Sequence, residues 1–115
     1  MRLVLLLVMF IVARIAVAGA PDTWTPKLQF QLEKSDYTQT LIWISGYGYA
    51  LTEIGHKNNR EGRVGGLCVP NNKLVDSRLL VDALNSKFKG QRITSEQASP
   101  VLLRAAESTY RCPAK

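Results

Sequence analysis

The 115-residue chain has very little histidine and cysteine, two residue types from which many catalytic and metal sites are built. It has one histidine, His56, and two cysteines, Cys68 and Cys112. A structural zinc ion usually takes four Cys or His ligands, so we expect no metal site. The sequence contains no Gly-x-Ser-x-Gly, no P-loop and no dinucleotide-binding glycine motif, and its carboxylates are scattered. We therefore expect neither an enzyme nor a bound cofactor.

Long hydrophobic runs are also missing. The apolar run at residues 3–12 is well short of the ~20 residues that a bilayer span needs. A basic start, this short run and the small residues Ala16 and Ala18 are typical of a secretory signal peptide. We predict a signal peptide at residues 1–18 that is cleaved near Ala18, with cleavage after Ala20 and an uncleaved membrane anchor as alternatives. We expect no stable membrane insertion after cleavage.

Export changes how the cysteines and the charge are interpreted. Two cysteines in an oxidising compartment are expected to pair, so we predict a disulfide between Cys68 and Cys112. Removing Arg2 and Arg14 with the signal peptide lowers the formal net charge of +6 by two, to +4. This mildly basic balance slightly favours an acidic partner. No pattern of basic and aromatic residues typical of nucleic-acid binding occurs, so we expect no nucleic-acid partner.

Residues 19–36 are predicted to form an N-terminal arm. Within residues 27–36 apolar and polar side chains alternate, and this period of two is typical of a strand. An isolated strand would have nothing to pair with, however. A strand, a short helix and an extended arm therefore stay open as alternatives for this stretch.

Three helical patterns follow in a domain of residues 37–115. The first spans residues 37–54, with Asp36 as its N-cap and apolar residues on most of its sides. Glycines in a helix interior usually mark close approach by another element, and a break at residues 46–48 is the alternative. We expect the helix-packing positions to be Gly46, Tyr47 and Ala50.

The other two helices lie between the cysteines. Asp76 is the expected N-cap of the second helix. The third helix begins either at Thr94 or at Ser99, and Ser99 is favoured because Pro100 would then occupy the first helical position. The predicted fold class is all-α, a small bundle of three to four helices clasped by one disulfide.

Residues 55–66 are predicted to form a polar, glycine-rich, basic loop. One interpretation is a solvated connector between two helices. The other is an exposed recognition loop, because loops carry a large share of binding residues. The candidate partner-binding residues in this loop are His56, Lys57, Arg60 and Arg63.

Four short motifs occur in a fixed order along the domain. They are Gly46-Tyr47-x-x-Ala50-x-x-Glu53, Leu67-Cys68-Val69-Pro70, Val101-Leu102-Leu103-x-Ala105-Ala106 and Tyr110-Arg111-Cys112. Their order and spacing resemble the Rap/Tai-type immunity proteins of type VI secretion systems.

The resemblance implies a small helical protein of the periplasm that carries an intramolecular disulfide and is often a homodimer. Its partner would be a cognate secreted peptidoglycan amidase effector, which it would bind and block by covering the active-site cleft. Two other functions are compatible with a small exported helical protein. One is a periplasmic acid-stress chaperone, and the other is a structural envelope protein that shares the fold without a toxin partner.

Overall fold

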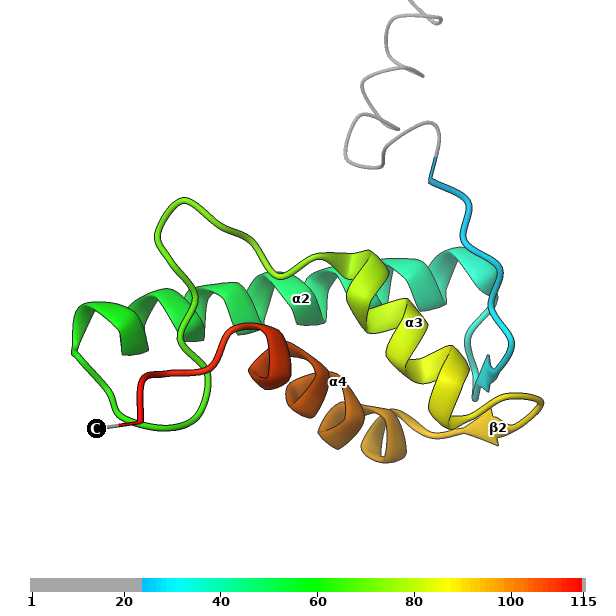
Figure 1. Cartoon of the computed structure of the whole chain (residues 1–115). Coiled ribbons are helices and arrows are strands. Elements are labelled where there is room, and N and C mark those ends of the chain that lie inside the picture. Colours follow the sequence, from blue (N-terminus) through cyan, green and yellow to red (C-terminus); the bar gives the residue numbers. More distant parts are fainter. Residues whose placement is uncertain (1–23, 115) are drawn as a thin grey trace, which may run out of the picture.

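The computed structural model describes residues 24–114. This part of the chain forms three helices and one short strand pair: β1 (Gln31–Leu32), α2 (Tyr37–Arg60), α3 (Ser77–Lys87), β2 (Arg92–Ile93) and α4 (Ser95–Thr109). Figure 1 shows α2 running along the whole described part, with α3 crossing it and α4 on the other side of α3. The predicted signal peptide, residues 1–18, and the first residues of the arm lie outside the described residues.

Helix α2 is longer than expected and is not broken at its glycines. Its N-cap is Asp36, as predicted, and a capping box with Gln39 closes the first turn. The helix continues through Gly46 and Gly48 and ends at Arg60. The prediction of a loop beginning at residue 55 was therefore wrong. The weak helix propensity of the glycine and asparagine residues in the last two turns is overridden by tertiary contacts made there.

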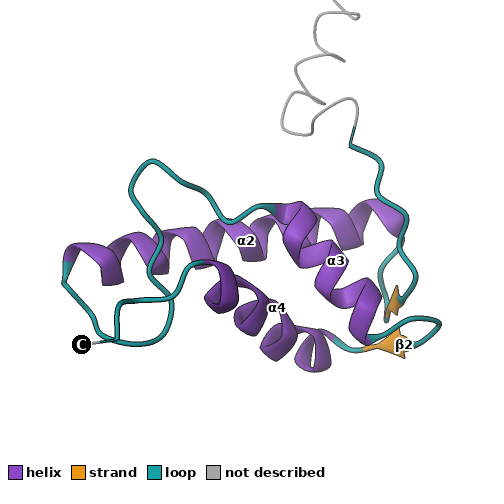
Figure 2. Ribbon diagram, viewed as in Figure 1, coloured by secondary structure: helices purple, strands orange, loops and turns teal. Residues whose placement is uncertain are grey.

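The N-terminal arm pairs with a distant part of the chain. β1 and β2 are parallel strands of two residues each, with Leu32 opposite Ile93. The alternation in residues 27–36 therefore did indicate a strand, and its partner is the short segment between α3 and α4. The all-helical prediction must be corrected to a mostly helical fold with one small strand pair, which Figure 2 shows at one end of the molecule.

Helix α4 starts one turn earlier than the favoured prediction. Thr94 is its N-cap and forms a capping box with Gln97, so Pro100 lies inside the helix. This capping box gives hydrogen-bond partners to two backbone amides at the start of the helix. Their stabilisation outweighs the loss of the one helical hydrogen bond that the proline cannot make. Asp76 is the N-cap of α3, as predicted.

The core lies between the three helices. Its fully buried side chains come from every helix, from β2 and from the segment between α2 and α3: Ile44, Val69, Leu80, Leu84, Ile93 and Leu102. No helix in the described residues is long and apolar enough to cross a membrane.

Candidate functional site

The disulfide predicted from the two cysteines is present. Cys68 and Cys112 are joined with a Cα–Cα distance of 4.6 Å, and both residues are buried. Backbone hydrogen bonds flank the bond on both sides, from the Cys68 amide to the Tyr110 carbonyl (2.9 Å) and from the Cys112 amide to the Gly66 carbonyl (2.9 Å). The chain after α4 is thereby held against the segment that follows α2.

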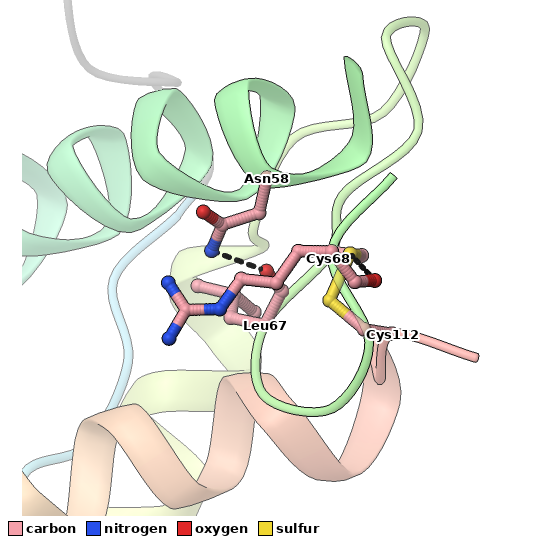
Figure 3. The surroundings of a disulfide bond; sticks show 5 residues. Asn58, Leu67, Cys68 and Cys112 are labelled. Carbon is pink, nitrogen blue, oxygen red and sulfur yellow. Dashed lines mark hydrogen bonds between the residues drawn. A yellow bond between two sulfur atoms is a disulfide. The ribbon is translucent and has the colours of Figure 1, made fainter. Parts of the chain in front are cut away.

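Residues 67–75, which we call the crossing segment, lie across the C-terminal half of α2. Four groups of α2 bind its backbone. The Asn58 amide donates to the Leu67 carbonyl (2.9 Å), as Figure 3 shows, and the Gly55 carbonyl accepts from the Val69 amide (3.0 Å). His56 Nε2 donates to the Lys73 carbonyl (2.8 Å), and Thr52 Oγ1 accepts from the Val75 amide (2.9 Å).

Gly55 is where the crossing segment comes closest to α2. A Cβ atom at this position would overlap Val69 Cγ2 and lie 2.8 Å from Val69 Cβ, which no side chain can accept. At Gly48 a Cβ would lie 3.1 Å from Leu80 Cδ1. These two glycines, seven residues apart on one face of α2, are the close-approach positions of the helix.

The helix-packing prediction therefore needs a correction. A Cβ atom added at Gly46 would meet nothing within 4 Å, and Ala50 is exposed. Both lie on the outer face of α2, away from the core. Tyr47 does pack against the core, where its hydroxyl donates to the Ser99 carbonyl (3.4 Å) and its ring lies 5.5 Å from that of Trp43.

The four candidate partner-binding residues do not share one loop. His56, Lys57 and Arg60 lie in the last two turns of α2, and only Arg63 lies in the loop that follows. His56 is half-buried and its Nε2 is occupied by the Lys73 carbonyl, so it supports the crossing segment. Lys57, Arg60 and Arg63 are exposed and stay available to a partner.

Positive charge is concentrated at the end of the molecule that carries the disulfide. We define this disulfide end as residues 54–73 and 110–114, which the bonds above hold together. It contains a single acidic residue, Glu61, and five basic ones: Lys57, Arg60, Arg63, Lys73 and Arg111. Residues 24–53 and 74–109 contain seven basic and seven acidic residues. The whole positive excess of the described residues thus belongs to the disulfide end.

Acidic side chains are dispersed over the part of the chain that the structure describes. The acidic side chains of residues 24–114 lie at the surface or only partly buried, and two of them, Asp36 and Asp76, cap helices. Within the same part of the chain, no three His, Cys, Asp or Glu side chains gather in a way that could hold a metal ion. What the disulfide end offers is a braced backbone surrounded by long cationic side chains.

Several residues that hold the crossing segment gave no signal in the sequence. Thr52 and Asn58 are ordinary polar residues of a helix, yet both bind the crossing segment from buried positions. Tyr110 was expected only as part of the closing motif Tyr110-Arg111-Cys112, but its hydroxyl donates to the Leu74 carbonyl (3.2 Å). A buried polar side chain on the core face of α2 is the one pattern that could have pointed to Thr52 and Asn58.

Comparison with known proteins adds no relative: no protein-family model, no curated protein and no solved structure matches this chain.

Proposed function

We propose that this protein is a periplasmic immunity protein that binds and blocks a peptidoglycan amidase delivered by a type VI secretion system. The observation that carries the proposal is the disulfide end, where the only positive excess of the described residues surrounds a backbone braced by Cys68–Cys112. Inhibition by occlusion needs a rigid surface that loses little conformational entropy on binding, and this end supplies one. The motif order that resembles the Rap/Tai-type proteins supports the same function.

The mechanism is stoichiometric binding and not turnover. The immunity protein covers the active-site cleft of the amidase and excludes peptidoglycan. The cationic side chains Lys57, Arg60 and Arg63 attract an acidic surface and raise the rate of encounter. On this proposal the protein is not an enzyme and needs no cofactor. Its mature domain is a disulfide-clasped helical bundle.

The test is inhibition of a defined set of enzymes. The mature protein is added to each peptidoglycan amidase encoded in the same genome, and peptide release from purified peptidoglycan is measured. We expect one amidase to lose its activity at a 1:1 molar ratio, with an association rate that falls as salt is added. If every amidase keeps its activity with an excess of this protein, the proposal fails.

The basic residues are tested with a variant that spares the fold. Replacing Lys57, Arg60 and Arg63 with alanine removes three exposed charges, whereas replacing His56 would also remove a hydrogen bond to the Lys73 carbonyl. The triple variant is expected to unfold at the same temperature as the native protein and to bind the amidase more weakly. A matched control replaces three exposed basic residues at and beyond the C-terminal end of α3: Lys87, Lys89 and Arg92.

An acid-stress chaperone is the alternative within the same compartment. Opening at low pH is driven by buried carboxylates or histidines that gain protons. No acidic side chain in residues 24–114 is buried, and His56 is half-buried. Incubation with an aggregating client protein separates the two functions, because a chaperone suppresses aggregation at low pH and an immunity protein does not. A structural envelope protein would do neither and would bind no amidase.

We further propose that two copies associate through the outer face of α2. Ile42 and Tyr49 are each 66% exposed on this face, and no charged side chain occurs in α2 between Thr38 and Thr52. A second copy would cover this apolar surface. Light scattering on the purified protein is expected to give the mass of a dimer, and Ile42→Glu is expected to give a monomer. A native protein that stays monomeric at high concentration excludes this assembly.

A further inference from the structure

The turn at residues 70–74 is exposed, yet side chains from other parts of the chain hold its backbone. Its residues are all exposed, and Leu74 is 68% exposed, the largest value for any large apolar side chain in the described residues. Leu74 belongs to neither the core nor the outer face of α2. Burying a large apolar side chain lowers the free energy, so an exposed leucine favours a partner that covers it.

The backbone of this turn is held from several sides. The turn closes on itself through a hydrogen bond from the Lys73 amide to the Pro70 carbonyl (2.9 Å). His56 of α2 then binds the Lys73 carbonyl (2.8 Å), and Tyr110 after α4 binds the Leu74 carbonyl (3.2 Å). The backbone carbonyls of Lys73 and Leu74 are thus each fixed by a side chain, and the two side chains come from different parts of the chain.

Buried residues anchor both ends of the turn. Val69, which is fully buried, binds the Gly55 carbonyl, and Val75, also buried, binds the Thr52 hydroxyl. The exposed turn is therefore preorganised between two anchors six residues apart. A preorganised turn loses little conformational entropy on binding, whereas a mobile connector would lose much.

The charge around Leu74 points to one class of partner. The turn carries Lys73 and adjoins the rest of the disulfide end, which contains Lys57, Arg60, Arg63 and Arg111. A partner that receives Leu74 must therefore offer an apolar pocket, and the surface around that pocket must be acidic. Lipid headgroups are anionic but form no pocket of fixed shape for one leucine.

We propose that the turn at residues 70–74 is the segment that enters the partner, with Leu74 filling an apolar pocket whose rim carries carboxylates. The inference rests on the proposed function in that the partner is a protein, and it adds which segment enters and what the cleft must look like. The 61–66 loop, which contains Arg63 and the exposed Val64, then lies at the margin of the contact. Its glycines Gly62, Gly65 and Gly66 all have positive φ.

Site-specific photo-cross-linking in the producing bacterium tests the inference without assuming which protein is bound. A photoreactive amino acid replaces Leu74 in the full-length chain, and Leu103, which is 37% exposed on α4, serves as the matched control. We expect a discrete protein adduct from position 74 and none from position 103. We also expect Lys73→Glu to remove the adduct, because the partner's rim is acidic.

Binding to the adduct partner gives the second measurement. Leu74→Ser is expected to weaken that binding at least about tenfold, as loss of a central apolar anchor does, while Leu103→Ser changes it by less than about twofold. Both variants should unfold at the native temperature, since neither side chain belongs to the buried core. Leu74→Met, which keeps the apolar volume, should restore most of the affinity.

The outcomes separate this inference from the proposed function. An amidase in the adduct supports both, and a different acidic protein supports the turn as the binding element but overturns the amidase as the partner. An inhibited amidase whose affinity is unchanged by Leu74→Ser overturns the inference and leaves the function standing. No adduct at position 74, an adduct with a second copy of this chain, or an adduct with lipid also overturns it.

Discussion

Gly55 and Gly46 are both interior residues of α2, but their surroundings differ completely. Gly55→Ala would force a Cβ to within 2.8 Å of Val69 Cβ, so we expect a loss of about 1–3 kcal/mol in the free energy of unfolding. Gly46→Ala meets no atom within 4 Å and removes a flexible residue from a helix, so we expect a gain of about 0.5–1 kcal/mol. Urea denaturation of the two variants measures both effects. Equal changes would contradict the crossing geometry.

Asn58 shows what one buried amide contributes. Asn58→Ala leaves the buried Leu67 carbonyl without its donor, and such a loss costs about 1–3 kcal/mol. The neighbouring Asn59 is exposed, so Asn59→Ala should stay within about 0.5 kcal/mol of the native protein. Thermal unfolding of the two variants isolates the contribution of the Asn58–Leu67 hydrogen bond to stability, because both variants make the same chemical change in the same helical turn. A matching loss in Asn59→Ala would mean that the hydrogen bond to the Leu67 carbonyl is not responsible, because helix propensity favours alanine at both positions.

At the scale of an element, a side chain of α3 helps to hold the N-terminal arm. Asn85 Oδ1 accepts from the Gln29 amide (2.8 Å) and Asn85 Nδ2 donates to the Lys27 carbonyl (2.8 Å). An asparagine on the surface of a helix usually faces solvent. The amide side chain instead reproduces the pairing of a strand backbone, and this holds the arm beside β2.

Asn85→Ala is expected to release the arm without unfolding the helices. Amide exchange should become faster at Gln29, Gln31 and Glu33, because local opening then requires fewer bonds to break. The core amides of α2 should keep their protection. Ser86→Ala, an exposed neighbour in the same helix, provides the control. Unchanged exchange in the arm would show that the strand pair alone holds it.

Pro100 distinguishes the two possible starts of α4. Because the helix begins at Ser95, Pro100 lies in its interior and leaves one backbone carbonyl without a helical partner. Pro100→Ala should therefore stabilise the protein, by up to about 3 kcal/mol. The gain is reduced because the unfolded chain has more conformational entropy with alanine than with proline. A helix beginning at Ser99 would place the proline at a favoured position, and the same substitution would then be neutral or destabilising. Chemical denaturation decides between these outcomes.

For the whole molecule, the disulfide is the largest single contribution that the structure identifies. The bond closes a loop between residues separated by 44 positions, which should stabilise the fold by roughly 4 kcal/mol in the chain-entropy model. Small domains have a total stability of about 5–15 kcal/mol, so much of the native stability would depend on this one bond.

Reduction and mutation should therefore have the same large effect. The Cys68→Ser, Cys112→Ser double variant is expected to unfold at a much lower urea concentration than the native protein, and reductant should move the native protein to the same midpoint. Adding reductant to the double variant is the control and should change nothing. A midpoint that shifts by less than the equivalent of about 1 kcal/mol would mean that the strand pair and the crossing segment suffice without the bond.

The parts that were predictable from sequence are those decided by neighbouring residues. The N-caps Asp36 and Asp76 and the apolar face of α3 follow from contacts within a few positions. The pairing of Cys68 with Cys112 followed because the chain has no third cysteine. The sequence proposed three basic residues of the disulfide end, Lys57, Arg60 and Arg63, as partner-binding candidates but did not include Lys73 or Arg111. His56, the fourth candidate, supports the backbone, and the exposed turn around Leu74 was not expected.

By itself, then, the sequence determined the helical character, the starts of α2 and α3 and the covalent clasp. These helix starts depend on residues a few positions apart, and each cysteine has only one possible partner. Only the tertiary structure decided that α2 continues to Arg60, that the arm forms a strand and that residues 70–74 become a rigid exposed turn. Those features rest largely on hydrogen bonds between residues far apart in the sequence, such as Asn58 with Leu67, 9 positions apart, and Asn85 with Lys27, 58 positions apart. The identity of a polar residue in the sequence does not reveal which distant backbone group its side chain will bind.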